Sequence, residues 1–305
     1  SGVERKAVMM EKHNDIRIGT IVFAEKAVAH IPQIANHGFE SFQLTFGRKI
    51  GELDVGSLAD QLCKMSEDAD HKWVISAIGI YGNPLANEQV ASDWLRLIET
   101  AGRFGCNLVT GFAGRIPDTP VPECIPRFRD VFQPLAEAAE QHNVRLAFEN
   151  CEMGGDWLRG DWNIAHSPTA WELMFDAVPS EAIGLEWEPC HQLVSFVDPL
   201  PQLRQWLPKV FHIHGKDATV LWDEIHRSGI RGGQPYVYHR TPGFGDTNWT
   251  DVISILRLGG FQGSIDIEGW HDPVYRDDLE MTGQVHALRY LKQCRGGDYV
   301  PNPDQ

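Results

Sequence analysis

The sequence has no long apolar run, and none of its hydrophobic stretches approaches the roughly 20 residues that a membrane-spanning helix needs. Its start, SGVERKAVMMEKHND, is polar and lacks the apolar core of a signal peptide. The six cysteines form no CxxC pair, and a chain of 305 residues needs no disulfide staples. These absences predict reduced thiols in a cytoplasmic protein without a membrane partner.

Basic residues are scarce as well, with 27 Lys and Arg against 42 Asp and Glu and a net charge of −15. A surface of this sign repels phosphate backbones, so we expect no nucleic-acid partner. Neither GxGxxG nor GxxxxGK[ST] follows the first β-rich run. This absence counts against an open, nucleotide-binding sheet.

What the sequence does contain is a regular alternation of short β-rich runs and longer segments with helical periodicity. Helix signals mark the boundaries: Asn36-His37-Gly38 ends one segment, and Ser167-Pro168 has the form of an N-cap followed by proline. The β-rich runs begin at Ile16, Glu40, Trp73, Asn107, Val144, Ala182, Lys209 and Ser264.

Eight such units favour parallel strands joined by right-handed crossovers and closed into a (β/α)8 barrel, over an open doubly wound sheet. Chain length alone suggests roughly two domains, but one α/β barrel also runs to about 250 residues or more. We therefore predict a single TIM-barrel domain over residues 1–305, with the barrel from about 16 to 292 and irregular tails at both ends.

Two connections are unusually long: residues 150–166 after the fifth β-rich run, and residues 216–248 after the seventh. Long loops inside a compact domain are usually functional or disordered. Both follow strands, and they therefore lie at the barrel face where active sites occur.

The last four β-rich runs each end in a residue that can bind a metal: Glu149, Glu188, His214 and Glu268. The carboxyl ends of barrel strands ring a single mouth, so we expect these side chains to converge. Because side chains alternate along a strand, Phe211 should face the helices while His214 faces the interior. A single glutamate at a strand end is usually a solvated loop residue, so the metal site is predicted from the matching positions of all four residues.

Three carboxylates crowded together would repel one another, and a divalent cation removes that repulsion. The predicted set is rich in oxygen, which suits Mn²⁺ or Mg²⁺, with Co²⁺ or Zn²⁺ as alternatives. Two remaining octahedral positions fit two oxygens of a sugar or polyol substrate.

One layer deeper, Arg145, Glu186, His212 and Asp266 are predicted to form a structural polar network, since buried charges need partners. Arg145 should lie beside Glu186. We interpret His212 as a supporting or core histidine and not as a fifth ligand.

Several segments resemble the xylose isomerase-like TIM-barrel family, whose members are commonly called sugar phosphate isomerases/epimerases. They are AFEN, GLEWEPCHQ, FHIHGKD, PGFGDTNW and GGFQGSIDIEGWHDP, and the resemblance extends from about Ile16 to Leu291. It implies that the four residues named above bind the metal. It also implies that His191 and Lys216 contact substrate or support the ligands.

The chain departs from the family pattern at two positions. Glu188 stands where the family usually has Asp, and the last motif reads IEGWHD instead of IEHED, which leaves the role of His271 open. The family also includes DNA-repair enzymes with additional histidines and a basic face, and the net charge of −15 argues against that branch.

The leading hypothesis is proton transfer at a carbon next to a carbonyl, in a sugar, keto-sugar or polyol, with Glu149 and Glu268 as general base and acid. This describes an isomerase or epimerase. The first alternative is a metal-dependent lyase or dehydratase acting on a keto-sugar, keto-inositol or 3-keto-glycoside. The second alternative is a sugar-binding barrel without catalysis.

Further substrate contacts are predicted for His191, Lys216, Trp157, His239, Arg240 and His271. Lys216 has an alternative reading as the charge partner of Asp217 or Glu268. Aromatic faces such as Trp157 stack well on sugars. His239 and Arg240 suit an anionic group, but no Gly-rich phosphate cradle is present. The aromatic-rich loops also suggest a homo-oligomer in which they cover a neighbour's barrel mouth.

Overall fold

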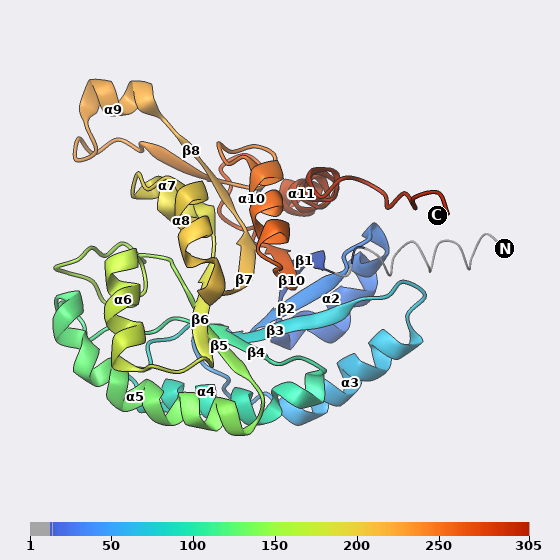
Figure 1. The fold of residues 1–305 in the computed structure, drawn as a ribbon, viewed down its shortest axis with the longest axis horizontal. Coiled ribbons are helices and arrows are strands. Elements are labelled where there is room, and N and C mark those ends of the chain that lie inside the picture. The colour runs from blue at the N-terminus through green and yellow to red at the C-terminus, as the bar shows by residue number, and fades with distance from the viewer. Residues whose placement is uncertain (1–12, 14, 305) are drawn as a thin grey trace.

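The computed structural model describes residue 13 and residues 15–304. Eight parallel strands close into a barrel in the order β1-β10-β7-β6-β5-β4-β3-β2, and helices cover its outer surface (Figure 1). Each strand overlaps one of the eight β-rich runs, so the predicted (β/α)8 barrel is confirmed. The strands are β1 (Ile16–Phe23), β2 (Ser41–Thr45), β3 (Val74–Ile80), β4 (Leu108–Gly111), β5 (Arg145–Glu149), β6 (Ile183–Trp187), β7 (Val210–Gly215) and β10 (Gly263–Ile267).

The helices begin and end at the local signals that the sequence contains. Ser167 caps α6 by accepting a hydrogen bond from the Ala170 amide, with Pro168 in the first turn. Gly38, at φ 105°, ends the first helical segment. The helices are α2 (Ala27–Ile34), α3 (Val55–Asp68), α4 (Glu88–Thr100), α5 (Val121–Gln141), α6 (Pro168–Ala177), α7 (Pro189–Val194), α8 (Pro199–Trp206), α9 (Trp222–Ser228), α10 (Trp249–Leu258) and α11 (Glu280–Cys294). Short 3₁₀ turns are η1 (Ala24–Lys26), η2 (Ala35–His37), η3 (Ala101–Phe104), η4 (Leu207–Lys209) and η5 (Asp277–Leu279).

The barrel elements thus run from Ile16 to Cys294. Residues 296–304, which follow the last barrel helix, form no helix or strand. The predicted N-terminal tail lies outside the described residues, apart from residues 13 and 15. No helix in the described part of the chain combines the length and the apolar character that crossing a membrane requires.

The hydrophobic core has two parts. The larger part lies between the strands and the helices, where Phe132 packs edge-on against Phe148, with ring centroids 4.9 Å apart, and against Trp94, at 5.2 Å. The smaller part consists of Ala77, Leu108, Ala147 and Phe211. It comes from alternate positions inside the barrel and fills the interior beneath the polar layer.

Phe211 does not face the helices as the alternation rule predicted. The β6–β7 register skips one residue, because Leu185 pairs with Val210 and Glu186 pairs with His212. A bulge of this kind breaks the alternation of side chains. Phe211 instead packs in the interior cluster, where a Cβ on Gly184 would lie 2.5 Å from its ring.

The predicted contact between Arg145 and Glu186 is also wrong. Leu146 pairs with Ile183, which places Arg145 at the start of the strand pair and Glu186 near its end. The guanidinium of Arg145 stacks on the ring of Phe211, with Cζ 4.2 Å from the centroid. Because the bulge turns Phe211 inward, the ring of Phe211 is in position to stack with the guanidinium of Arg145.

The two long connections differ in structure. Residues 150–166 contain no helix or strand. Residues 216–248 instead fold into the antiparallel pair β8 (Asp217–Val220) and β9 (Val237–Arg240), with α9 between them. Figure 1 shows this insertion standing out from the barrel beyond α7.

Candidate metal centre

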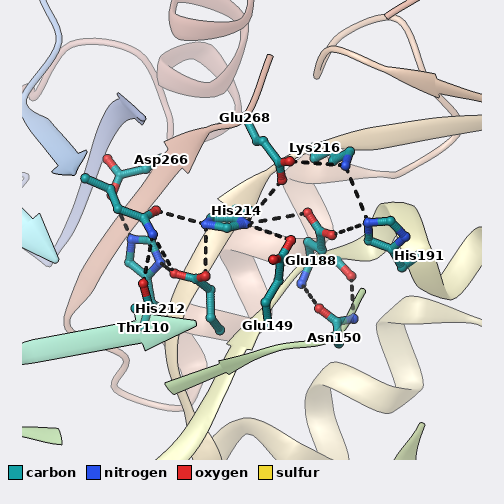
Figure 2. Close-up of polar contacts among 12 residues, drawn as sticks. Thr110, Glu149, Asn150, Glu188, His191, His212, His214, Lys216, Asp266 and Glu268 are labelled. Carbon is teal, nitrogen blue, oxygen red and sulfur yellow. Dashed lines mark hydrogen bonds and ion pairs between the residues drawn. The ribbon is translucent and has the colours of Figure 1, made fainter. Parts of the chain in front are cut away.

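The four predicted ligands come from four neighbouring barrel strands and meet at one end of the barrel (Figure 2). Glu149 is the last residue of β5, and His214 is the next-to-last residue of β7. Glu188 directly follows β6, and Glu268 directly follows β10. Because the strands are parallel, all four positions lie at the carboxyl-terminal mouth.

The side chains of these four residues converge closely. One ligand atom from each lies within 4.8 Å of the other three. His214 Nδ1 lies 3.5 Å from Glu149 Oε1 and 3.3 Å from Glu268 Oε2. It also lies 3.7 Å from Glu188 Oε2, and the Glu188 side chain is fully buried. Three carboxylates and one imidazole therefore face one another away from bulk water.

Several of these ligand atoms are buried without a hydrogen-bond partner: both carboxylate oxygens of Glu188, Oε2 of Glu268 and Nδ1 of His214. A buried polar atom left unpaired costs about 1–3 kcal/mol, and more when the group is charged. A divalent cation between these side chains would bind His214 Nδ1 and one carboxylate oxygen of each glutamate, and it would offset the repulsion of the carboxylates. The residues present therefore fit a metal ion.

The pKa values of two of the carboxyl groups are shifted in opposite directions. Burial raises the pKa of Glu149 to about 8, and the negative charges of Glu188 and Glu268 add to this effect. Burial also acts to raise the pKa of Glu268, but Lys216 and His214 hold it well below its usual range. Carboxyl groups whose environments separate their pKa values are typical of acid–base catalysis.

His214 is oriented through its second ring nitrogen. Nε2 lies 2.9 Å from Gln43 Oε1 and 3.1 Å from Glu186 Oε1. Both partners are acceptors, so Nε2 donates its proton to them and Nδ1 faces the carboxylates. A partner of this kind behind a histidine ligand fixes the ring and its tautomer.

A buried polar layer lies beneath the ligands, as predicted. His212 Nδ1 lies 2.7 Å from Glu186 Oε2, and its Nε2 lies 2.7 Å from Asp266 Oδ2. Ser41 and Ser76 donate hydrogen bonds of 2.6 Å to the two oxygens of Asp266. Both nitrogens of His212 are thus engaged by carboxylates, which supports the interpretation of His212 as a supporting residue.

Lys216 and His191 lie beside the ligands, toward α7. Lys216 Nζ lies 3.2 Å from Glu268 Oε1 and 3.4 Å from His191 Nε2. His191 Nε2 is also 2.7 Å from Glu188 Oε1, an ion-pair distance without hydrogen-bond geometry. Of the two partners that the sequence offered to Lys216, the structure selects Glu268. Asp217 instead accepts hydrogen bonds from residues at the start of α10.

His239 and His271 extend this group outward. The ring of His239 packs edge-on against His191, with centroids 5.3 Å apart, and lies 6.0 Å from the ring of His271. His271 Nε2 is 3.4 Å from Glu268 Oε1, and its side chain is half exposed. The insertion that carries His239 therefore reaches the mouth of the barrel.

Arg240 and Trp157 have other contacts. Arg240 Nε lies 3.0 Å from Asp272 Oδ2. Neighbours on a strand alternate in direction, so Arg240 points away from the side of His239. Trp157 is partly buried and packs against the main hydrophobic core. Substrate contact by either side chain stays a prediction.

Three residues near the ligands were not predicted from the sequence. Gln43 Nε2 lies 2.9 Å from Glu186 Oε2, and the Tyr81 hydroxyl lies 2.6 Å from Glu186 Oε1. Glu152 Oε2 lies 2.8 Å from His191 Nδ1. Polar residues at every second position of β2 were the available signal for Gln43. No local pattern marks Glu152.

A family model described as a xylose isomerase-like TIM barrel matches residues 31–294 of the 305. This chain belongs to the xylose isomerase-like TIM-barrel family. The matched region includes all four predicted ligands, and the resemblance that was inferred from five short segments is confirmed.

Individual members of the xylose isomerase-like family share only part of the sequence with this chain. An inosose dehydratase from Lactiplantibacillus plantarum is 30% identical over 124 residues, which are 40% of this chain and 40% of that protein. The chain thus matches about two-fifths of the length of this relative. Other relatives with the same description, from Clostridium perfringens, match at 25% identity over 129 residues.

Solved structures show the same fold over nearly the whole chain. A xylose isomerase domain protein from Planctomyces limnophilus has a TM-score of 0.68 at 16% identity, covering 92% of this chain and 98% of that one. A D-psicose 3-epimerase, solved in the presence of D-fructose, has a TM-score of 0.68 at 14% identity, covering 92% and 100%. At these identities the similarity shows the fold alone.

Proposed function

We propose that this protein is a divalent-metal-dependent isomerase or epimerase that moves a proton at a carbon next to a carbonyl of a sugar, keto-sugar or polyol. The observation that carries the proposal is the convergence of the four ligands, with buried atoms that have no other partner. Their oxygen-rich set best suits Mn²⁺ or Mg²⁺, with Co²⁺ or Zn²⁺ as alternatives. A cation bound there would polarise the carbonyl oxygen of the substrate as a Lewis acid.

Glu149 and Glu268 are the proposed proton-transfer groups. Of the two, Glu149 is the proposed general base and Glu268 the proposed general acid, and a bound cation would hold both carboxyl groups in place beside the substrate. Lys216 Nζ lies 3.2 Å from Glu268 Oε1 and would stabilise that carboxyl group whenever it is ionised. The two residues follow β10 and end β5, which are separated by two barrel strands. They therefore approach a substrate from different sides of the mouth.

Lys216 and His191 are the proposed binding groups for substrate oxygens. The Lys216 ammonium has three N–H donors, and the contacts with Glu268 and His191 use two of them, which leaves one for a substrate oxygen. The His191 ring is held between Glu188 and Glu152. Both side chains are buried, so their hydrogen bonds to a substrate would form in a site largely closed to water.

The second candidate is a metal-dependent dehydratase or lyase on a keto-sugar, keto-inositol or 3-keto-glycoside. The match to inosose dehydratases favours it. Removal of the proton next to the carbonyl is common to both candidates. In the dehydratase, Glu268 as the general acid would give a proton to the hydroxyl that leaves the neighbouring carbon, and water would be released.

The test is proton exchange in D₂O. Protein stripped with a chelator and reloaded anaerobically with Mn²⁺ is incubated with a panel of keto-sugars and keto-inositols. Deuterium on the carbon next to the carbonyl, in an epimer or isomer, supports the proposal. An unsaturated product or a released aglycone supports the second candidate. A protein that binds Mn²⁺ and returns every compound unchanged and undeuterated would contradict both.

Variants connect the activity to the site. Glu149→Gln should lose turnover or Mn²⁺ affinity, because it removes both a ligand oxygen and a proton-transfer group. Glu172→Gln, at an exposed position of α6, is the matched control and should retain both. Full turnover and affinity in Glu149→Gln would remove this residue from the site.

A further inference from the structure

A second group of ligand-type side chains lies beyond His191, outside the four-residue site. Cys151, Glu152 and His191 each offer one atom, and these three atoms lie within 4.8 Å of one another. Cys151 and Glu152 belong to the loop after β5, and His191 belongs to α7 after β6. A thiol, a carboxylate and an imidazole thus meet between two adjacent strand ends.

Two of these atoms are buried without a hydrogen-bond partner: Glu152 Oε2 and His191 Nδ1. They lie 2.8 Å apart, and the His191 side chain is only 3% exposed. An ordinary ion pair at this distance would point the N–H group at the oxygen. Neither atom has a hydrogen bond of that geometry, so a lone pair of the Glu152 oxygen and, when the ring is neutral, the lone pair of His191 Nδ1 are available to a shared cation.

We propose that Cys151, Glu152 and His191 bind a second, thiophilic divalent cation of the Zn²⁺ type. A sulfur, an oxygen and a nitrogen ligand suit zinc, and a thiolate ligand disfavours Mg²⁺. The negative charges of the Cys151 thiolate and the Glu152 carboxylate neutralise the cation in this buried place. On binding, the S–H bond breaks, a bond from sulfur to the metal forms, and the proton leaves to solvent without any redox change.

A neighbouring group offers an alternative place for such an ion. Cys190, His191 and His239 also lie within 4.8 Å of one another. That group has only one anionic ligand, so it neutralises a divalent cation less well. The Cys151 group therefore carries the proposal, and Cys190 serves to test it.

His191 would connect the second site to the first. Its Nδ1 faces Glu152 and its Nε2 faces Glu188, a ligand of the first site. A cation bound to Nδ1 leaves the ring proton on Nε2. That N–H group points toward Glu188, and Nε2 can then no longer accept a hydrogen bond from Lys216. Occupancy of the second site would thereby set the hydrogen bonding of two groups beside the proposed catalytic carboxylates.

The test uses Cd²⁺ as the probe, because a cadmium–thiolate bond has an ultraviolet charge-transfer band that an oxygen and nitrogen site lacks. The full chain is titrated with Cd²⁺ in the presence of excess Mg²⁺. We expect a saturating band at one equivalent, its loss in Cys151→Ser, and binding weakened about tenfold or more in Glu152→Gln. Cys124→Ser changes a buried cysteine outside both groups and should keep the band and the affinity.

The proposal does not rest on the catalytic assignment, and Glu149→Gln separates the two. This variant lacks a ligand of the first site and should keep the cadmium band. Absence of the band in the unaltered protein overturns the proposal, and so does a band that survives in Cys151→Ser. Loss of the band in Cys190→Ser, with retention in Cys151→Ser, would assign the ion to the neighbouring group instead. As a control, the melting temperature of Glu152→Gln without Cd²⁺ is compared with that of the unaltered protein, and we expect no difference large enough to attribute the weaker Cd²⁺ binding to unfolding.

Discussion

Gln43 and His214 meet across the barrel, with Gln43 Oε1 2.9 Å from His214 Nε2. Gln43 lies on β2 and His214 on β7, two strands that are not neighbours in the sheet. The amide nitrogen of Gln43 in turn lies 2.9 Å from Glu186 Oε2. Gln43 is therefore held in place by the polar layer while it fixes the direction in which His214 presents Nδ1.

Replacing Gln43 should weaken metal binding without removing any ligand. In Gln43→Met the nearer of the two acceptors for His214 Nε2–H is lost and only Glu186 remains. We expect Mn²⁺ affinity to fall about 10-fold, the lower end of the usual effect of losing a partner behind a histidine ligand. Titration calorimetry measures the change. Gln61→Met, at an exposed position of α3, is the control. Equal affinity in Gln43→Met and the unaltered protein would contradict the orienting role.

The bridge between Glu186 and Asp266 should be essential for stability. In His212→Leu two buried carboxylates lose their shared partner, and removing one member of a buried charged network typically costs about 3–5 kcal/mol. Urea unfolding monitored by tryptophan fluorescence gives the difference. His30→Leu, at an exposed position of α2, should behave like the unaltered protein. A loss below about 1 kcal/mol would show that the layer relaxes around the missing ring.

A second buried ion pair, far from the ligands, predicts how stability depends on pH. Arg295 donates hydrogen bonds of 2.7 and 3.0 Å to the two oxygens of Glu40. Burial acts to raise the pKa of Glu40, but Arg295 holds it below the usual value of 4.5. Because this pKa is lower in the folded chain, the pair stabilises the fold above pH 4.5, and the stabilisation is lost as the pH falls through the folded value.

Glu40→Gln should therefore lower the free energy of unfolding by about 2 kcal/mol near pH 7, the range for a hydrogen bond to a charged group. The difference from the unaltered protein should shrink as the pH falls below 4.5. Asp68→Asn breaks the exposed pair with Lys64 and should have little effect at any pH. A difference for Glu40→Gln that stays constant down to acid pH would contradict the assignment.

Removing a ligand should have opposite effects on stability with and without metal. In chelator-treated protein above pH 8, where the Glu149 carboxyl is ionised and repels Glu188 and Glu268, Glu149→Gln removes that repulsion, so the melting temperature should rise. With saturating Mn²⁺ the same variant should melt lower than the unaltered protein, because ion binding stabilises the folded state in proportion to affinity. A shift of the same sign in both conditions would argue that Glu149 does not contact the ion.

The sequence predicted the barrel and the convergence of the four candidate ligands because both depend on regular features. Strand ends of a closed parallel sheet share one mouth, so the positions of Glu149 and Glu268 could be inferred without knowing the register. Phe211 and Arg145 were placed wrongly because the bulge on β7 depends on how two strands pair. That pairing is a contact between separate segments and leaves no local pattern.

The same limit applies to the insertion and to the partners of the ligands. Strands β8 and β9 have four residues each, too short for a clear alternation, and they are stabilised by pairing with each other. Tyr81 and Glu152 reach the site from a strand end and a loop that carry no recognisable motif. Each becomes visible as a partner only when Glu186 and His191 are placed in three dimensions.

The most direct measurement is the anomalous diffraction of crystals soaked with Mn²⁺. We predict one manganese peak at the barrel mouth, about 2.0–2.4 Å from His214 Nδ1 and from a carboxylate oxygen of each of the three glutamates. A map with no manganese between these side chains, or with the ion held elsewhere on the protein, would contradict the metal-dependent function.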